Sequence, residues 1–339
     1  MKNRSTPTLD DVARAAGVST ATVSRCLNFP DRVVDSTRQK VLRAIDDLGY
    51  TPNFGARVMA SRRTFTIGAI VPTMENAIFA RGLQAFQEEC HQRGYTLLVA
   101  SSAYRPEVEE EQIGQLVARG ADGLLLIGFD RHDRIYDFLN RRNVPAVVAW
   151  TFAENTPLPC VGFDNHASMQ NLAQSVLDQG HRNVAVISAV TEGNDRARDR
   201  VEGVRAALRV RGVNLEPSHV IEVPYDVQNG AAAFDRLMAL EPRPTAVICG
   251  NDVLAVGAVV RARELGLTVP VDVSITGFDD IEMARIVTPA LTTVRVPHSE
   301  MGRRAACELI DIVEGKSSGA SVELQSAVQV RASLGPAST

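Results

Sequence analysis

Apolar residues in the first sixty positions recur at helical spacing between turn residues, so this segment is predicted to be all-helical. Thr8 followed by Asp11 is typical of a helix N-cap with its N3 partner, and Gly17 is typical of a C-terminal stop. A first helix is therefore predicted over Leu9–Ala16. Its apolar face consists of Leu9, Val12, Ala13 and Ala16.

A second helix is predicted almost at once, because Ser19 can cap a helix from Thr20 to about Leu27 whose buried face is Val23 and Leu27. Two helices joined by a tight turn that contains glycine have the spacing of a helix-turn-helix. The exposed face of the second helix carries side chains that can contact base edges and phosphates. They are Thr20, Ala21, Thr22, Ser24 and Arg25. A plain three-helix bundle with a solvated polar face is the alternative.

A third amphipathic helix is predicted from a cap near Asp35 or Ser36 to a stop at Gly49. Its inward face is Val41, Leu42, Ile45 and Leu48. The following segment, residues 53–61, has room for about two helical turns, which are marginal in isolation, and Gly55 costs roughly a further 1 kcal/mol. We expect this segment to be frayed when free and helical when two copies pack together; a simple linker is the alternative.

From Thr66 onward short apolar strands alternate with amphipathic helices, which predicts an α/β fold of doubly wound parallel sheets with helices on both faces. The predicted strands are 67–71, 96–100, 123–127, 146–150, 184–188, 221–223, 246–249, 274–278 and 292–294. The predicted helices include 79–93, 108–119, 167–179, 200–210, 231–240, 253–265 and 299–312. These elements suffice for two sheets, so a two-lobed body is expected.

Ligands of such sheets bind beyond the carboxyl ends of the strands, so the residues that directly follow strands are candidates for a binding site. They are 76–79, Trp150, Asp164, 191–200, Tyr225, Asn251, Asp252, Asp279 and Asp280. An arginine, several carboxylates and aromatic rings around one cleft suit a polyhydroxylated or anionic small molecule. Asp164 with Asn165, and Asp252, can instead simply cap the helices that follow them.

Charge is unevenly distributed along the 339 residues. Residues 1–63 hold 11 Lys and Arg against 6 Asp and Glu, whereas the remainder holds 25 against 34. A basic head on an acidic body is expected where only the head meets a polyanion such as DNA. The N-terminus has the charge but not the apolar stretch of a signal peptide, no apolar run could span a bilayer, and the five scattered cysteines lack CxxC pairs, so a cytoplasmic location with free thiols is expected.

An enzyme and a secreted receptor are the alternatives to a DNA-binding regulator. An enzyme is disfavoured because the chain has no GxGxxG after a strand, no Walker motif, no HExxH and no GxSxG. Its six histidines show no metal-ligand spacing, so neither a metal nor a cofactor is expected. A secreted sugar-binding receptor would suit the body alone, but it explains neither the helical head nor the missing signal peptide.

The run TLDDVARAAGVSTATVSRCLNFPDRVVDSTRQKVLRAIDDLGYTPN, residues 8–53, resembles the DNA-binding domain of the LacI/GalR family of bacterial repressors. This resemblance implies that Thr20, Ala21 and Arg25 read bases. It implies that the side chains at or near the phosphate backbone of DNA are those of Ser19, Ser24, Asn28 and Arg32. It further implies that residues 53–63 form a hinge helix in the minor groove, with Met59 as the wedge between base pairs and Ala56 at the close-packing position.

The resemblance continues through the body in the motifs DGLLLIG, VGFDN, GHRNVAVI, GFDD and PALTTVRVPHSEMG, which are similar to the periplasmic-binding-protein-like core of the same family. It implies a small-molecule effector and a homodimer on a near-palindromic operator. The implied effector residues are Ile78, Phe79, Trp150, Asp164, Arg200, Tyr225, Asn251 and Asp279. Trp150 stands where sugar-specific members often have Asp, which disfavours a neutral galactoside-like ligand.

Two stretches, AYRPEVEEEQI and CVGFDNHASM, most resemble gluconate-utilisation repressors and favour a sugar-acid effector. A corepressor-dependent or globally acting regulator of carbon metabolism is the alternative, since the sequence does not decide whether the effector induces or corepresses. The expected domains are a helix-turn-helix over 1–52, a hinge over 53–63, and two lobes. The first lobe is expected over 64–162 plus 293–321, and the second over 163–292 plus 322–339.

Overall fold

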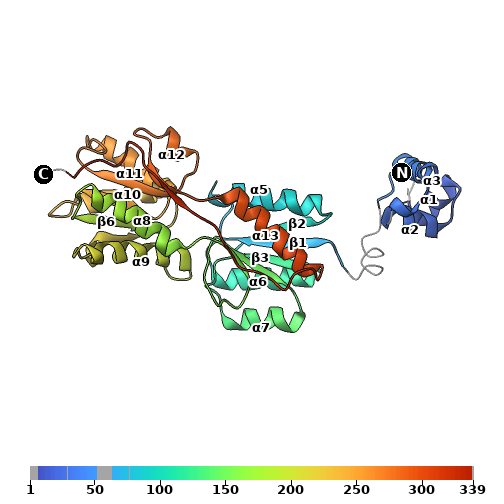
Figure 1. The fold of residues 1–339 in the computed structure, drawn as a ribbon. Helices are drawn as coiled ribbons and strands as arrows, with labels where there is room; N and C mark the ends of the chain where they lie inside the picture. Colours follow the sequence, from blue (N-terminus) through green and yellow to red (C-terminus); the bar gives the residue numbers. More distant parts are fainter. Residues whose placement is uncertain (1–6, 29, 52–62, 76, 338–339) are drawn as a thin grey trace. The chain divides into compact units, whose positions relative to one another are not determined.

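The computed structural model describes residues 7–28, 30–51, 63–75 and 77–337 (Figure 1). They belong to two compact units, one ending at Thr64 and the other beginning at Phe65. We call the first unit the head and the second the body. In these described ranges no helix has the length and apolar character needed to cross a membrane. Ala56 and Met59 of the expected hinge lie outside the described residues.

The head contains α1 (Leu9–Ala16), α2 (Thr20–Asn28), a 3₁₀ turn (Pro30–Arg32) and α3 (Asp35–Leu48). The start of α1 is confirmed as a capping box in which Thr8 and Asp11 bond each other's backbone N–H groups. Its end is confirmed at Gly17, whose φ of 67° is the left-handed conformation that glycine adopts without steric cost. The predicted helix-turn-helix is therefore present.

The predicted inward face of α3 is partly wrong. Leu42 and Leu48 are 44% and 37% exposed, whereas Val41 and Ala44 are buried in one cluster with Val12 of α1. The sequence favoured the larger leucines, but the small Ala44 faces the core because it allows close helix packing. The predicted cap is also wrong, since α3 starts after Val34, which makes no side-chain capping bond.

The body contains two six-stranded sheets. The first, in the N-lobe, has the strand order β11-β5-β4-β3-β1-β2, and the second, in the C-lobe, has the order β12-β10-β9-β8-β6-β7. All recorded strand pairs are parallel except β10 with β12. The N-lobe strands are β1 (Thr66–Val71), β2 (Thr96–Ser101), β3 (Gly123–Ile127), β4 (Ala146–Ala149), β5 (Cys160–Gly162) and β11 (Val322–Glu323). The C-lobe strands are β6 (Val184–Ser188), β7 (Val220–Glu222), β8 (Ala246–Cys249), β9 (Ser274–Asp279), β10 (Thr292–Arg295) and β12 (Ala327–Gln329).

Helices cover the faces of both sheets (Figure 1). Those of the N-lobe are α5 (Ala77–Gln92), α6 (Pro106–Ala118), α7 (Asp133–Arg142) and α13 (His298–Val313). Those of the C-lobe are α8 (Asn165–Asp178), α9 (Asp195–Val210), α10 (Val227–Met238), α11 (Asp252–Glu264) and α12 (Met283–Ile286). The predicted two-lobed α/β body is confirmed, but β5, β11, β12, α7 and α12 were not predicted. The strands among them have two or three residues and α12 has four, which is too short for a periodic signal. α7 does carry one, since its buried Ile135 and Leu139 are at helical spacing, and it was missed.

The expected lobe boundaries near the C-terminus are wrong. β10 was assigned largely to the first lobe, but it pairs with β9 in the C-lobe sheet. β11 was assigned to the second lobe, but it pairs with β5 in the N-lobe sheet. The chain thus crosses between lobes after β5, after β10 and after β11. Sequence periodicity did not mark these crossings, because the sheet that a strand joins is decided by its pairing with strands far away in the sequence.

Candidate functional site

A small cavity lies between the lobes, where the carboxyl ends of strands from both sheets face each other. We call it the cleft cavity. Its lining residues are Ile78, Phe79, Tyr104, Trp150, Asn194, Arg196, Arg200, Tyr225 and Asp279. Six of the eight residues expected in the effector site are therefore brought together, as the rule for ligand sites at strand ends predicts. The exceptions are Asp164 and Asn251.

Asp164 and Asn251 act in the structure as helix caps. The Asp164 carboxylate accepts a hydrogen bond of 2.9 Å from Ala167 N at the start of α8, and Asn251 Oδ1 accepts one of 2.9 Å from Leu254 N at the start of α11. Neither residue is part of the cavity lining. Asp252, the other suspected cap, is not one: its carboxylate accepts bonds from the Thr293 hydroxyl and from Ile281 N.

Tyr104, Asn194 and Arg196 complete the lining. The last two fall in the stretch 191–200 that strand position had marked, but Tyr104 was missed. Tyr104 lies three residues after β2, so a wider window after each strand would have found it. Its ring centroid is 5.9 Å from that of Tyr225, so the two rings meet across the cleft from opposite lobes.

Arg200 is held rigidly on three sides. Its Nε donates a hydrogen bond of 2.8 Å to Asn165 Oδ1, and its Nη1 donates one of 2.8 Å to the Gly250 carbonyl. The guanidinium carbon lies 3.7 Å from the centre of the Phe278 ring, a close cation–π contact. The remaining Nη2 is 3.7 Å from Asp279 Oδ1. Arg200 is therefore preorganised, because its fork is fixed before any ligand arrives.

Asp279 is the most unusual group of the site. Its side chain is fully buried, and neither carboxylate oxygen has a hydrogen-bond partner in the described part of the chain. Burial raises its pKa to about 6, although Arg200 and Arg196 act in the opposite direction. A buried acceptor without donors is energetically costly, which indicates that a bound molecule supplies the missing donors.

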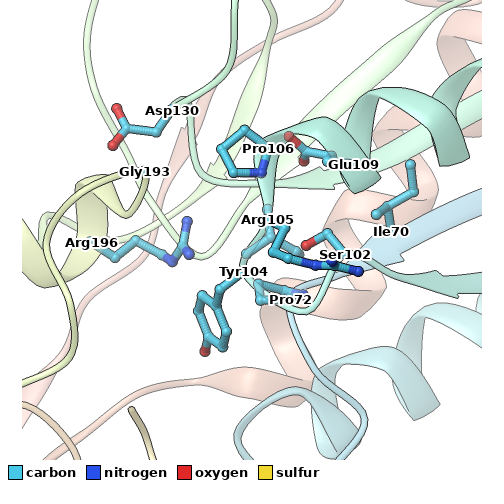
Figure 2. Close-up of a pocket in the computed structure, with 11 residues that line it drawn as sticks. Ile70, Pro72, Ser102, Tyr104, Arg105, Pro106, Glu109, Asp130, Gly193 and Arg196 are labelled. Atoms are coloured by element: carbon cyan, nitrogen blue, oxygen red, sulfur yellow. The ribbon is translucent and has the colours of Figure 1, made fainter. Parts of the chain in front are cut away.

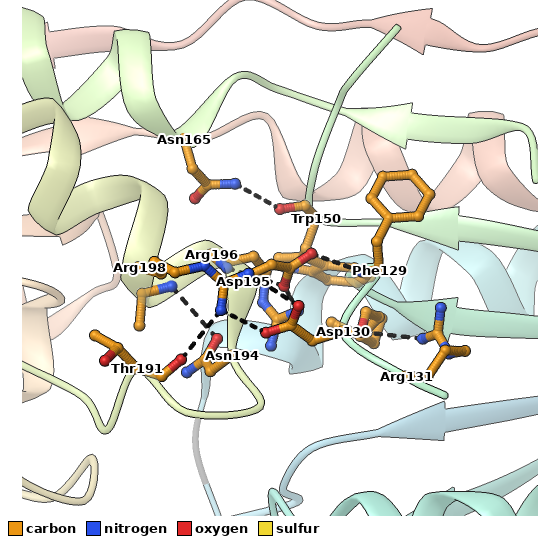
Figure 3. Close-up of polar contacts among 12 residues, drawn as sticks. Phe129, Asp130, Arg131, Trp150, Asn165, Thr191, Asn194, Asp195, Arg196 and Arg198 are labelled. Atoms are coloured by element: carbon orange, nitrogen blue, oxygen red, sulfur yellow. Dashed lines mark hydrogen bonds and ion pairs between the residues drawn. The ribbon is translucent and has the colours of Figure 1, made fainter. Parts of the chain in front are cut away.

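Trp150 forms the apolar wall of the cavity. It packs edge-on against Phe79 with ring centroids 5.3 Å apart, and its carbonyl accepts a bond of 3.0 Å from Asn165 Nδ2 (Figure 3). The indole Nε1–H is buried and has no partner among the described residues. Asn165 therefore links the backbone of Trp150 to the fork of Arg200.

Strained backbone is concentrated at this site. Among the described residues, eight other than glycine have a positive φ. Five of them line or adjoin the cleft cavity: Ala103, Tyr104, Trp150, Asp279 and Asp280. Such conformations cost on the order of 1–3 kcal/mol each and cluster at functional sites. Their distribution supports the same location as the unsatisfied polar atoms.

Two polar contacts close the lobes against each other beside the cavity (Figure 3). Asp195 Oδ2 of the C-lobe accepts a bond of 2.5 Å from Phe129 N of the N-lobe. Arg198 pairs with Asp130 across the cleft through two bonds of 2.8 and 2.9 Å. We call these contacts the latch. Gly128 fits under it closely, since a Cβ atom there would lie 1.8 Å from Arg196 Nη1.

Figure 2 shows a second small cavity. Tyr104 and Arg196 line both this cavity and the cleft cavity. Its other lining residues include Arg105, Glu109 and Asp130. Each cavity has a volume of about 20 Å³, enough for roughly one water molecule. A ligand of sugar size therefore requires the lobes, or the Tyr104 and Arg196 side chains between the two cavities, to move apart.

The polar face of α2 is the candidate DNA surface of the head. Val23 and Cys26 are buried under this helix, while Ala21 and Arg25 are exposed and Thr20 and Ser24 are half-buried. Ser19 caps the helix, because its Oγ accepts a bond of 3.2 Å from Thr22 N. Asn28 is the last residue of α2, and Arg32 is exposed at the end of the 3₁₀ turn.

Comparison with known proteins matches both units to one family. Residues 8–53 match the family described as bacterial regulatory proteins, lacI family. Residues 64–332 match the family described as periplasmic binding proteins and sugar binding domain of LacI family. These two matches cover nearly all the described residues.

Similar proteins of known role are transcriptional regulators. Catabolite control protein A of Priestia megaterium is 32% identical over 87% of this chain and 89% of its own length. The HTH-type transcriptional repressor CytR of Escherichia coli is 33% identical over 95% of this chain and 94% of its own. A solved structure of the lac repressor dimer, bound to operator and the anti-inducer ONPF, is 25% identical with a TM-score of 0.86, and the match covers 98% of this chain and all of that one.

Proposed function

We propose that this chain, which belongs to the LacI family of bacterial regulatory proteins, binds a palindromic operator as a homodimer and is released from it by a sugar acid such as gluconate. The coarser statement, a DNA-binding repressor with a sugar-binding body, follows from the family itself. The operator, the dimer and the acid are the parts that need experiments.

The buried carboxylate of Asp279, whose oxygens accept no hydrogen bond from the described residues, is the observation that carries the effector proposal. Two adjacent hydroxyl groups of a sugar would donate to its two oxygens, while Arg200 Nη2, 3.7 Å away, would donate to the same part of the ligand. Because Asp279 and Arg200 are both fixed before binding, little further ordering is required.

The preference for an acid is supported by the two arginines of the lining. Arg196 pairs with Asp195 at 2.8 Å, and Arg200 lies beside Asp279. Because one carboxylate neutralises Arg196, Arg200 at the same end of α9 can offer its guanidinium donors to a ligand carboxylate in addition to Asp279. Trp150 contributes an N–H donor at a place where an aspartate would repel an acid. Phe79, Tyr104 and Tyr225 would cover the apolar faces of the carbon chain.

For the head, we propose that Thr20, Ala21 and Arg25 contact base edges. Ser19, Ser24, Asn28 and Arg32 would contact the phosphate backbone. A single helix-turn-helix makes few contacts, so two heads on two half-sites are the expected way to reach specific affinity. Ala56 and Met59 would pack and insert at the centre of the operator as the paired hinges order on DNA.

Two measurements on the purified full chain test these parts separately. Selection of bound sequences from a pool of random DNA duplexes should enrich a palindrome. If the Arg25→Ala variant no longer enriches that palindrome, α2 is the helix that reads the DNA sequence. A thermal-shift screen should show stabilisation by gluconate, about 2.7 kcal/mol at a concentration of 100 times its Kd, but not by glucose. Stabilisation by neutral sugars alone would reject the acid and leave the regulator intact.

A further inference from the structure

A third cavity, larger than the cleft cavity, has three arginines and His298 among its seven lining residues. Its volume is about 130 Å³, room for roughly four waters and so for a tetrahedral oxyanion. It is lined by Arg81, Asp280, Arg285, Arg295, Val296, His298 and Ser299, none of which lines the cleft cavity. We call it the arginine cavity.

Its charge is not balanced by the protein. The single aspartate of the lining, Asp280, is 1% exposed and accepts hydrogen bonds from three arginines. These are Arg285 at 3.0 Å, Arg295 at 2.9 Å and Arg331 at 2.5 Å. The fourth arginine, Arg81, pairs with the exposed Glu282 at 3.1 Å. Four guanidinium groups thus share two carboxylates, and a net charge of two positive remains around the cavity.

The unused donors face solvent within this cavity. In the described part of the chain Arg285 and Arg295 each bond Asp280 through one nitrogen, while their side chains stay 57% and 51% exposed. One arginine suffices to neutralise one carboxylate, and Arg331 alone would do so for Asp280. The two exposed arginines therefore need another explanation than the neutralisation of Asp280.

The start of α13 adds a second kind of anion donor. His298 and Ser299 are its first residues, and the N-cap Pro297 makes no side-chain capping bond. The backbone N–H groups of such a helix end carry partial positive charge and are suited to anions. His298 stays neutral at this place, since burial lowers its pKa to about 4. Its Nε2–H donates to the Asp279 carbonyl, so the ring links the two cavities and leaves the binding of the anion to the other groups.

We propose that the arginine cavity binds a phosphate-type dianion, free or as a phosphate monoester, that bridges the two lobes. Arg81 reaches it from α5 of the N-lobe, whereas Asp280 and Arg285 belong to the C-lobe. A dianion matches the excess charge of two and the forked donors of the arginines. His298 connects the site with the cleft cavity, because its Nε2 lies 3.1 Å from the Asp279 carbonyl and its ring 6.5 Å from that of Trp150. Phosphate bound here would therefore favour one separation of the lobes.

The test is calorimetric titration of the full chain with inorganic phosphate. It compares two variants that each replace one exposed, ion-paired arginine by alanine. Arg81→Ala removes an arginine that is 44% exposed and pairs only with an exposed glutamate, so folding should be unaffected. Arg304→Ala is its control, since Arg304 is 53% exposed and pairs with Glu300 at 3.0 Å on the same helix as Ser299. We expect the affinity for phosphate to fall about tenfold or more in Arg81→Ala and to change less than about twofold in Arg304→Ala.

A further variant, Arg200→Ala, separates the two cavities. If phosphate binds in the arginine cavity, this variant keeps its affinity; if phosphate enters the cleft cavity, Arg200→Ala loses it and Arg81→Ala does not, which overturns the proposal. Equal losses in Arg81→Ala and Arg304→Ala would show unspecific charge attraction and also overturn it, as would the absence of binding by the unaltered protein at millimolar phosphate. None of these outcomes depends on whether gluconate binds.

Discussion

Replacing Asp279 by asparagine should make the ligand-free body more stable while removing its affinity for the effector. In the folded protein, burial raises the pKa of Asp279 from 3.8 to about 6. The native state therefore holds this proton more tightly than the unfolded state does. As pH rises from the unfolded pKa of 3.8 to the folded pKa of about 6, the free energy of unfolding therefore falls. Above the folded pKa the full cost of burying the charged carboxylate is present.

The expected magnitude follows from that difference. About two pKa units correspond to about 3 kcal/mol at pH 7.5, which is an upper value because a buried amide also lacks hydrogen-bond partners. At pH 5 the carboxyl of the native protein is largely protonated, and the advantage of Asp279→Asn should shrink to roughly half. The midpoint of urea unfolding at both pH values measures this. Trp150, the single tryptophan of the chain, reports the transition of the body.

The adjacent Asp280 is the matched control. Its hydrogen bonds from Arg285, Arg295 and Arg331 lower its pKa to about 2, the opposite direction. Stability from such a group is present above pH 3.8 and is lost as pH falls through the folded pKa, so Asp280→Asn should destabilise the protein at pH 7.5. A stability of Asp279→Asn no higher than that of the unaltered protein, or an advantage that persists unchanged at pH 5, would show that burial of the Asp279 charge does not destabilise the body.

Three other predictions concern DNA reading and lobe closure. Arg25→Ala should weaken operator binding by roughly 1–3 kcal/mol in fluorescence anisotropy, whereas Arg14→Ala, on the exposed face of α1, should not; equal effects would remove α2 as the reading helix. Arg198→Ala breaks the half-exposed pair with Asp130 and should cost less than about 1 kcal/mol of stability, yet raise the radius of gyration in small-angle scattering; an unchanged radius would refute the latch. Gly128→Ala should likewise raise the radius of gyration of the ligand-free protein, because its φ is 71° and its Cβ would meet Arg196, which keeps the lobes from closing; an unchanged radius would contradict this.

The architecture was predictable because its signals are periodic. The capping box of α1, the glycine that ends it and the alternation of strands and helices each repeat a local rule, and they gave the helix-turn-helix and two lobes. The places where the chain changes lobes carry no such signal, since β10 and β11 pair with sheets that are decided by contacts far away in the sequence.

The site was predictable only in outline. Arg200, Trp150 and Asp279 were found because polar or aromatic residues after parallel strands converge. Asp164 and Asn251 obey the same rule, yet they cap helices, because a polar side chain between a strand and a helix can serve either purpose. The arginine cavity was not anticipated, since its residues come from α5, α12, the start of α13 and the ends of β9 and β10.

The most direct test of effector-controlled repression measures how operator and gluconate change each other's binding affinity on one preparation of the full chain. Anisotropy titrations of a labelled, selected operator with and without gluconate give one coupling factor, and calorimetric titrations of gluconate with and without operator give the other. We expect each ligand to weaken the binding of the other, and by the same factor, because coupling of binding is reciprocal. Operator affinity that is unaffected by saturating gluconate would contradict it.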